Sequence, residues 1–125
     1  MANDELYTPK WVFHALNMEF DLDVCAPHDG SWHTPTKAHI CACCGDGLTD
    51  PWHGVVFMNP PYSAPTSWVY KWINHNNGIA LVPMSKSQWF NTLWQSPAVG
   101  VPLTPRMKFD SPAGKPQPIF MPTML

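Results

Sequence analysis

Residues 54–62 read GVVFMNPPY, an apolar run followed directly by a polar, proline-rich turn. The unbroken apolar run between Gly54 and Asn59 is typical of a strand that is buried on both faces of a parallel sheet. The two prolines have a fixed φ angle and no N–H group, so they end the strand in a stiff, extended conformation. We therefore predict a strand over 55–58 that holds Asn59 at its carboxyl end.

Further strands are predicted before and after this run. Residues 20–25 alternate apolar and acidic side chains and end at Ala26-Pro27, which is typical of a strand that enters a loop. Residues 79–82 form a second continuous apolar run and predict another buried strand. Shorter strands are predicted nearer the C-terminus, at residues 99–101, 107–109 and 119–121.

Amphipathic helices are predicted between these strands. Thr8-Pro9 has the composition of an N-cap and first helical position, and it predicts a helix over 9–17. A second helix is predicted after Pro65, with Thr66 or Ser67 as N-cap and Asn76-Asn77-Gly78 as a left-handed stop.

The order of these elements indicates the fold class. A third helix, predicted from Ser87, completes an alternation of strands and helices that is typical of an α/β domain with a mostly parallel central sheet. The length of 125 residues fits a single domain over 1–125. Residues 27–54 show no clear period and are predicted to be irregular. Ligands of such sheets bind at the carboxyl ends of the strands, where both polar motifs fall.

Charge and hydropathy restrict the location and partners of the protein. No apolar run approaches the roughly 20 residues that span a bilayer, and the N-terminus does not resemble a signal peptide, so we expect a cytoplasmic protein without a membrane partner. The formal net charge of −2 means that contact with DNA would need a local basic patch. The candidates for phosphate contacts are scattered and could equally form a solvated face: Lys86, Arg106, Lys108 and Lys115.

The tetrapeptide Asn59-Pro60-Pro61-Tyr62 carries the groups needed to act on the exocyclic amine of a base. Such a nitrogen is a poor nucleophile because its lone pair is delocalised into the ring. The Asn59 side-chain oxygen and the Pro60 carbonyl can accept the two amine hydrogens and favour a tetrahedral nitrogen. Pro61 stiffens the turn, and the Tyr62 ring can stack on an extruded base. The alternative is an ordinary proline turn with an aromatic anchor.

These features together resemble the amino-methyltransferases, which have an Asn-Pro-Pro-Tyr motif at the same strand end, and more narrowly the phage-type, Dam-like DNA N6-adenine methyltransferases. The resemblance implies a Rossmann-like methyltransferase fold, S-adenosylmethionine as cofactor and DNA adenine as substrate. The segments that carry it, in the family's order, are Tyr7-Thr8-Pro9 with Val12-Phe13, Leu22 to Ala26, Asp46-Gly47-Leu48 with Trp52, Phe57 to Tyr62, Leu81-Val82-Pro83 with Trp89-Phe90, and Arg106 to Phe109.

The resemblance also implies roles for individual residues. Two segments are implied to contact the cofactor, and their residues are Tyr7, Thr8 and Pro9 in the first and Asp23, Cys25 and Ala26 in the second. Asp46 is implied to contact the cofactor's adenine amine, with Leu48 or Trp52 packing on that ring. As ordinary structure, Asp23 would be a solvent-facing strand residue and Asp46-Gly47 a common turn.

The sequence departs from the family's pattern in two places. The loop after Cys25 reads Pro27-His28-Asp29-Gly30 where many relatives have a glycine-rich turn. The last apolar run, 119–125, stops early, so we expect a truncated or minimal domain. No segment is long enough for a separate DNA-recognition domain, and base contacts are expected from loops 27–45 and 84–88 or from a partner subunit, for example in a homodimer.

A group of cysteines and histidines offers an alternative role for the irregular segment. The ligand types suit a tetrahedral, structural zinc site, although the spacing matches no familiar zinc pattern and does not favour it. The residues of this group are His33, His39, Cys41, Cys43 and Cys44.

Three other interpretations stay open at this point. Methylation of cytosine N4 uses the same kind of amine and the same cofactor. A degenerate relative would bind cofactor or DNA without catalysis. A zinc-stabilised interaction module would use the tryptophans and residues 33–44 as its binding surface.

Overall fold

The computed structural model describes residues 8, 10–26, 34–41, 46–61, 63–83, 85–102 and 119–123. In these ranges, no helix has the length and apolar character needed to cross a membrane. The described residues form three helices and seven strands: α1 (Lys10–Leu16), β1 (Leu22–Ala26), β2 (His39–Cys41), β3 (Val56–Met58), α2 (Thr66–His75), β4 (Gly78–Ala80), β5 (Val82–Pro83), α3 (Gln88–Gln95), β6 (Val99–Pro102) and β7 (Ile119–Thr123).

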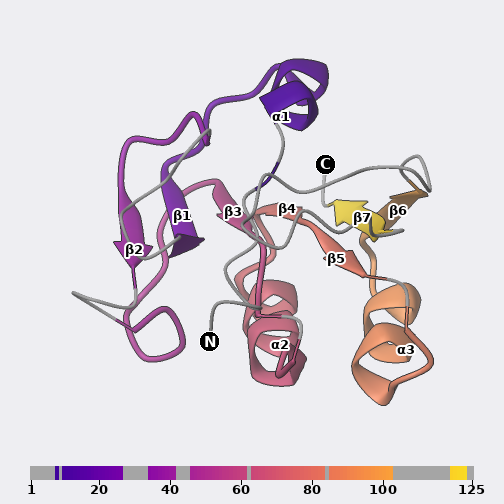
Figure 1. The fold of residues 1–125 in the computed structure, drawn as a ribbon. Helices are drawn as coiled ribbons and strands as arrows, with labels where there is room; N and C mark the ends of the chain where they lie inside the picture. The colour runs from indigo at the N-terminus through magenta and orange to yellow at the C-terminus, as the bar shows by residue number, and fades with distance from the viewer. Residues whose placement is uncertain are drawn as a thin grey trace.

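The strands form one mixed sheet in the order β2-β1-β3-β4-β7, with β5 and β6 also paired to β7 (Figure 1). β2, β1, β3 and β4 are parallel to their neighbours, whereas β7 runs antiparallel to β4, β5 and β6. Only Leu81 separates β4 from β5, and both pair with β7, so they act as one interrupted strand. The observed α/β architecture is that of a Rossmann-like methyltransferase fold, as predicted, with an antiparallel strand at its C-terminal side.

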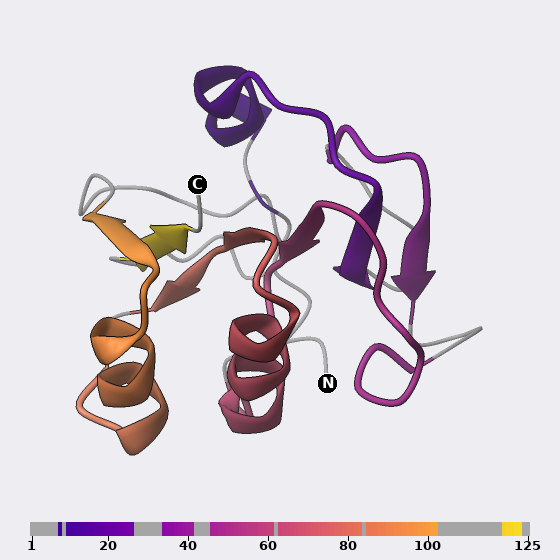
Figure 2. The ribbon, with the colours of Figure 1, turned by 180° about the vertical axis from the view of Figure 1, so that it is seen from behind.

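Helices cover both faces of the sheet, α1 on one and α2 with α3 side by side on the other (Figures 1 and 2). Val12 and Phe13 of α1 pack on Phe57, and the Phe13 and Phe57 ring centroids lie 4.9 Å apart, edge to face. On the opposite face Trp72 and Leu93 pack against the strand residues Val24, Val56, Met58, Ala80 and Val82. This two-sided burial explains why β3 and β4 have continuous apolar sequences.

The helix ends agree with the sequence in part. Asn76 has φ of 60° and its N–H donates to the Trp72 carbonyl at 3.0 Å, which confirms the predicted left-handed stop of α2. The predicted side-chain cap of α2 is wrong, because the N-cap position is Pro65 and the helix already includes Thr66. Ser87 stands at the N-cap of α3 but makes no capping bond, and its hydroxyl instead accepts from Ser85.

The other element predictions differ in their boundaries. α1 ends at Leu16, one residue before the predicted end, and Pro9 lies outside the described residues. The prediction that 27–54 is irregular is wrong at β2, whose three residues are too few to show a period and are held by pairing with β1. Strands at 99–101 and 119–121 are confirmed within β6 and β7, whereas 107–109 lies outside the described residues.

One carboxylate joins the amino ends of three parallel strands. Asp21, just before β1, accepts a hydrogen bond from the Val55 N–H at 2.9 Å and lies 3.4 Å from the Lys37 ammonium, which precedes β2. The hydrogen bond from Val55 is the main cause that holds the pKa of Asp21 below its ordinary value, and the nearby Lys37 charge adds to it. Asp21 therefore contributes to stability in its charged form.

Asp21→Asn should remove this contribution in a pH-dependent way. A lowered pKa in the folded state stabilises the protein fully above about pH 4, and the effect is lost as the pH falls through the folded-state pKa. We expect the variant to be less stable than the natural protein at pH 7, and the difference to shrink as the pH falls below about 4, as measured by urea unfolding. Equal stability at pH 7 would contradict this role.

Gly78 starts β4 in a conformation that other residues rarely adopt. Its φ is 152°, and a Cβ atom there would lie 2.2 Å from the Val56 carbonyl oxygen of β3. Because that oxygen belongs to a buried strand backbone, it has little freedom to move away. Only glycine allows β4 to approach β3 this closely.

Gly78→Ala should therefore weaken the centre of the sheet. We expect a loss of about 1–3 kcal/mol in the free energy of unfolding, which combines backbone strain and the clash with Val56. Thermal unfolding followed by circular dichroism measures this loss. Asn77→Ala, at an exposed neighbouring position, is the control and should change stability by less than about 0.5 kcal/mol.

Candidate functional site

The carboxyl ends of β1 and β3 lie next to each other in the sheet. Their parallel register pairs Leu22 with Val56 and Asp23 with Phe57. Extension of this register by two residues brings Cys25 beside Asn59 on the sheet face that carries Phe57 and α1. The two polar motifs predicted from the sequence therefore meet at one edge of the sheet.

A hydrogen bond joins Asn59 to the segment that precedes α1. The Asn59 side-chain nitrogen donates to the Thr8 hydroxyl oxygen at 3.1 Å, across 51 positions of the sequence. Thr8 is buried, with 7% of its surface exposed, and Asn59 is half-buried. Because the amide nitrogen faces Thr8, the orientation of the amide group is set and its oxygen Oδ1 is the acceptor end.

The prolines after Asn59 form the rigid part of the site. Pro60 is buried and Pro61 is half-buried. The Pro61 carbonyl accepts a hydrogen bond from the Ala64 N–H at 3.2 Å and is thus engaged in the turn toward α2. The Pro60 carbonyl is therefore the better candidate for a second acceptor. Tyr62 lies outside the described residues, as do Tyr7 and Pro9.

Asp23 differs from its predicted environment. The alternating pattern of residues 20–25 indicated a solvent-facing carboxylate, whereas Asp23 is 2% exposed and lies within β1. β1 is an inner strand, paired with β2 on one side and with β3 on the other, a setting that the local alternating pattern does not reveal. The Asp23 Oδ1 accepts from the Cys25 N–H at 3.3 Å. Cys25 is half-buried and Ala26 is buried at the end of the strand.

Asp46 and Leu48 belong to a short turn with a well-defined hydrogen-bond pattern. The Asp46 Oδ1 accepts from the Leu48 N–H at 2.9 Å, and the Asp46 N–H donates to the Asp50 carboxylate at 3.1 Å. Leu48 is one of the large apolar residues on the surface, with 38% of its area exposed. Trp52 instead donates its indole N–H to the Gly47 carbonyl at 2.7 Å and packs inward, so Leu48 is the better candidate for contact with a ligand ring.

Two residues that hold this turn, Gly47 and Lys71, were not assigned this role from the sequence. A Cβ atom at Gly47 would lie 2.2 Å from the Val24 carbonyl oxygen of β1 and 2.5 Å from the Trp68 ring of α2. Lys71 of α2 donates to carbonyl oxygens of the turn and lies 4.9 Å from the centroid of the Trp52 ring. Its isolated position as a lysine among the aromatic residues of α2 was the only available signal.

Burial also changes the electrostatics of Lys71. Removal from water lowers the pKa of its ammonium group below the ordinary value, and the carboxylates of Asp50 and Asp46 partly offset this effect. The carboxylates and the carbonyl oxygens of the turn surround the ammonium group and thus compensate in part for its removal from water.

The predicted zinc and phosphate ligands are only partly described. His39 and Cys41 lie in β2, whereas His33, Cys43 and Cys44 fall outside the described residues. Within the part of the chain that the structure describes, no three metal-ligating side chains gather at one point. Of the four candidate phosphate ligands only Lys86 is described, and it is exposed.

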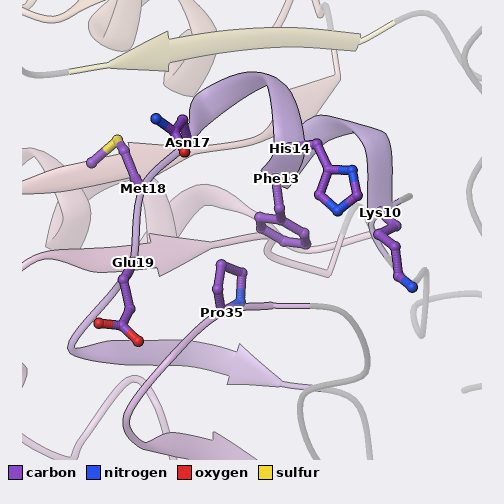
Figure 3. Close-up of a pocket in the computed structure, with 7 residues that line it drawn as sticks. All are labelled: Lys10, Phe13, His14, Asn17, Met18, Glu19 and Pro35. Carbon is purple, nitrogen blue, oxygen red and sulfur yellow. The ribbon is translucent and has the colours of Figure 1, made fainter.

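A separate hollow of about 460 Å³ lies between α1 and the chain that leads into β1 and β2 (Figure 3). It is found at the amino ends of these strands and includes none of the predicted site residues. Its lining combines cationic, acidic and apolar groups: Lys10, Phe13, His14, Asn17, Met18, Glu19 and Pro35. The hollow is thus distinct from the edge where Asn59 lies.

Comparisons with known proteins give a consistent result. Residues 1–110 match the family model described as DNA N-6-adenine-methyltransferase (Dam). The chain is also 33% identical over 95 residues to the DNA N-6-adenine-methyltransferase of Haemophilus phage HP1 (strain HP1c1), a match that covers 67% of this chain and 53% of that protein. The chain thus spans about half the length of this curated relative. No solved structure matches the chain.

Thr8→Val tests the link between Thr8 and Asn59. Valine keeps the shape of threonine but leaves the part-buried Asn59 amide without this acceptor, so we expect a loss of about 1–3 kcal/mol in unfolding free energy. Thr8→Ser retains the hydroxyl and should lose less. Urea unfolding of both variants measures the difference, and a valine variant at least as stable as the serine variant would contradict the assigned bond.

Proposed function

The chain belongs to the DNA N-6-adenine-methyltransferase (Dam) family, and on that premise we propose that it transfers a methyl group from S-adenosylmethionine to the N6 amine of adenine in DNA. The observation that carries the proposal is the hydrogen bond between Asn59 and Thr8. This bond connects the end of β3, which we assign to the target amine, with the N-terminal segment around Thr8, which we assign to the cofactor. One edge of the sheet can thus hold both reactants.

The residues at this edge fit the parts of the cofactor. Asp23 contributes a carboxylate close to the end of β1, near Cys25 and the small, buried Ala26, where a backbone can approach a ligand closely. Leu48 offers exposed apolar surface for a flat ring, next to Asp46 as a polar partner. When bound there, S-adenosylmethionine would supply an electrophilic methyl group.

Asn59 and Pro60 would act on the target amine as hydrogen-bond acceptors. The Asn59 amide is oriented by its donation to Thr8, so Oδ1 is the atom directed to an amine hydrogen. The Pro60 carbonyl would accept the second hydrogen, since the Pro61 carbonyl already accepts from Ala64. Two acceptors held in advance stabilise the tetrahedral nitrogen of the transition state more than the planar amine. No covalent intermediate with the protein is needed.

The position of Asn59 at a buried strand end means that a base inside a duplex cannot reach it. The target adenine would therefore leave the base stack before reaction, and Tyr62 is the residue we assign to stacking on it. DNA is thus the proposed partner. Loops 27–45 and 84–88, or a partner subunit such as a second copy of the chain, are the proposed sources of further base contacts.

The first test is transfer of radiolabelled methyl groups from S-adenosylmethionine to unmethylated DNA, followed by identification of the modified base. We expect N6-methyladenine. Asn59→Ala should reduce the rate about a hundredfold or more, because it removes one of the acceptors from the transition state. Asn91→Ala, an exposed residue of α3, is the matched control and should retain the natural rate.

Other outcomes of the same experiment would contradict the proposal. Cofactor binding without methyl transfer would indicate a degenerate relative. N4-methylcytosine as the product would show that the chemistry is correct and the substrate base is not. A rate that Asn59→Ala leaves unchanged would remove Asn59 from the proposed role.

A further inference from the structure

We propose that Lys71 is a positioning residue for the adenosine end of the cofactor, because it holds the turn of residues 46–50 in place. This inference rests on the proposed function, in which Asp46 and Leu48 contact the adenine ring. Lys71 itself lies on α2 and is not assigned to contact the cofactor. Lys71 would affect cofactor binding indirectly, because it fixes the backbone of the turn that carries Asp46 and Leu48.

The three hydrogen-bond donors of the Lys71 ammonium all serve the same turn. Nζ lies 3.0 Å from the Gly47 carbonyl oxygen, 3.1 Å from that of Leu48 and 2.6 Å from that of Asp50. An ammonium group has three donors, so its hydrogen-bonding capacity is filled by these carbonyls. A lysine without a specific role would extend its charge into water.

Additional contacts bring the turn close to β1, α2 and Trp52. A Cβ atom at Gly47 would clash with both the Val24 carbonyl oxygen of β1 and the Trp68 ring, so the backbone of the turn lies close to both. The Trp52 indole shares the Gly47 carbonyl with Lys71 and lies beneath the ammonium. The turn thus lies between β1, α2 and Trp52, and the Lys71 ammonium group is the charged group that binds it.

The consequence for binding follows from what the turn displays. The carbonyl groups of Gly47 and Leu48 face Lys71, while the Leu48 side chain is exposed on the turn. Loss of the ammonium would remove the Lys71 donor from the Leu48 and Asp50 carbonyls, while the Gly47 carbonyl would still accept from Trp52. Leu48 and Asp46 could then move relative to β1. Contacts with the adenine ring would weaken, whereas the acceptors at Asn59 and Pro60 would keep their geometry.

Gly78→Ala provides a control for stability. Gly78 begins β4, and a Cβ atom there would meet Val56 of β3, which is not assigned to the cofactor. Gly78→Ala should lower stability without an effect on cofactor affinity.

The experiment measures binding of S-adenosylhomocysteine and of 5′-methylthioadenosine by calorimetry, with methyl transfer at saturating cofactor. For Lys71→Met we expect about tenfold weaker binding of both compounds, by the same factor, because both carry the adenosine end. The kcat at saturating cofactor should stay within about twofold of the natural value. Lys71→Arg should bind with intermediate affinity, since a planar guanidinium keeps the charge but cannot direct three donors in the same way.

Each outcome separates this inference from the proposed function. A natural protein that binds neither compound would overturn both. If the natural protein binds both compounds, and Lys71→Met and Lys71→Arg bind them with the same affinity, only the role of Lys71 would be overturned. Equal loss of affinity in Gly78→Ala would show a general effect of stability and would also overturn it. If Lys71→Met fails to fold, the comparison of Lys71→Arg with Gly78→Ala decides.

Discussion

The parallel pairing of β1 with β3 is the constraint on which the rest of the structure depends. It makes both strands inner strands of the sheet, and the burial of β3 on both faces explains its continuous apolar run. The same pairing places two strand ends side by side, so that Cys25 and Asn59 leave the sheet at one edge. The packing that stabilises the core therefore also assembles the candidate site.

Close contacts between backbones fix the loops around that site. At Gly78 the first residue of β4 touches the Val56 carbonyl, and at Gly47 the turn touches the Val24 carbonyl. Any larger residue at either position would push apart elements that meet at the sheet. Polar side chains then act on these contacts, Asp21 at the amino ends of the strands and Lys71 at the turn near their carboxyl ends. Both side chains bind backbone groups, so each directly fixes the position of a loop backbone.

The two ends of the sheet have different characters. At the amino ends, Asp21 with Lys37 and the hollow beside α1 consist of groups that serve packing and charge balance. At the carboxyl ends, Asn59 is held by Thr8, and the turn of residues 46–50 exposes the Leu48 side chain. A parallel sheet creates this difference because all of its parallel strands deliver their ends to the same edge.

The sequence by itself determined the strand at 55–58, the α/β class and the motif at Asn59 to Tyr62, because periodicity and proline geometry are local properties. It did not determine β2, whose short length carries no period, or the burial of Asp23, which depends on neighbours from distant parts of the chain. The bond between Asn59 and Thr8 and the contacts of Lys71 with Gly47, Leu48 and Asp50 were decided only by the tertiary structure. They join residues that are far apart in sequence, and only the packing of α2 and of the N-terminal segment around the sheet brings them within hydrogen-bond distance.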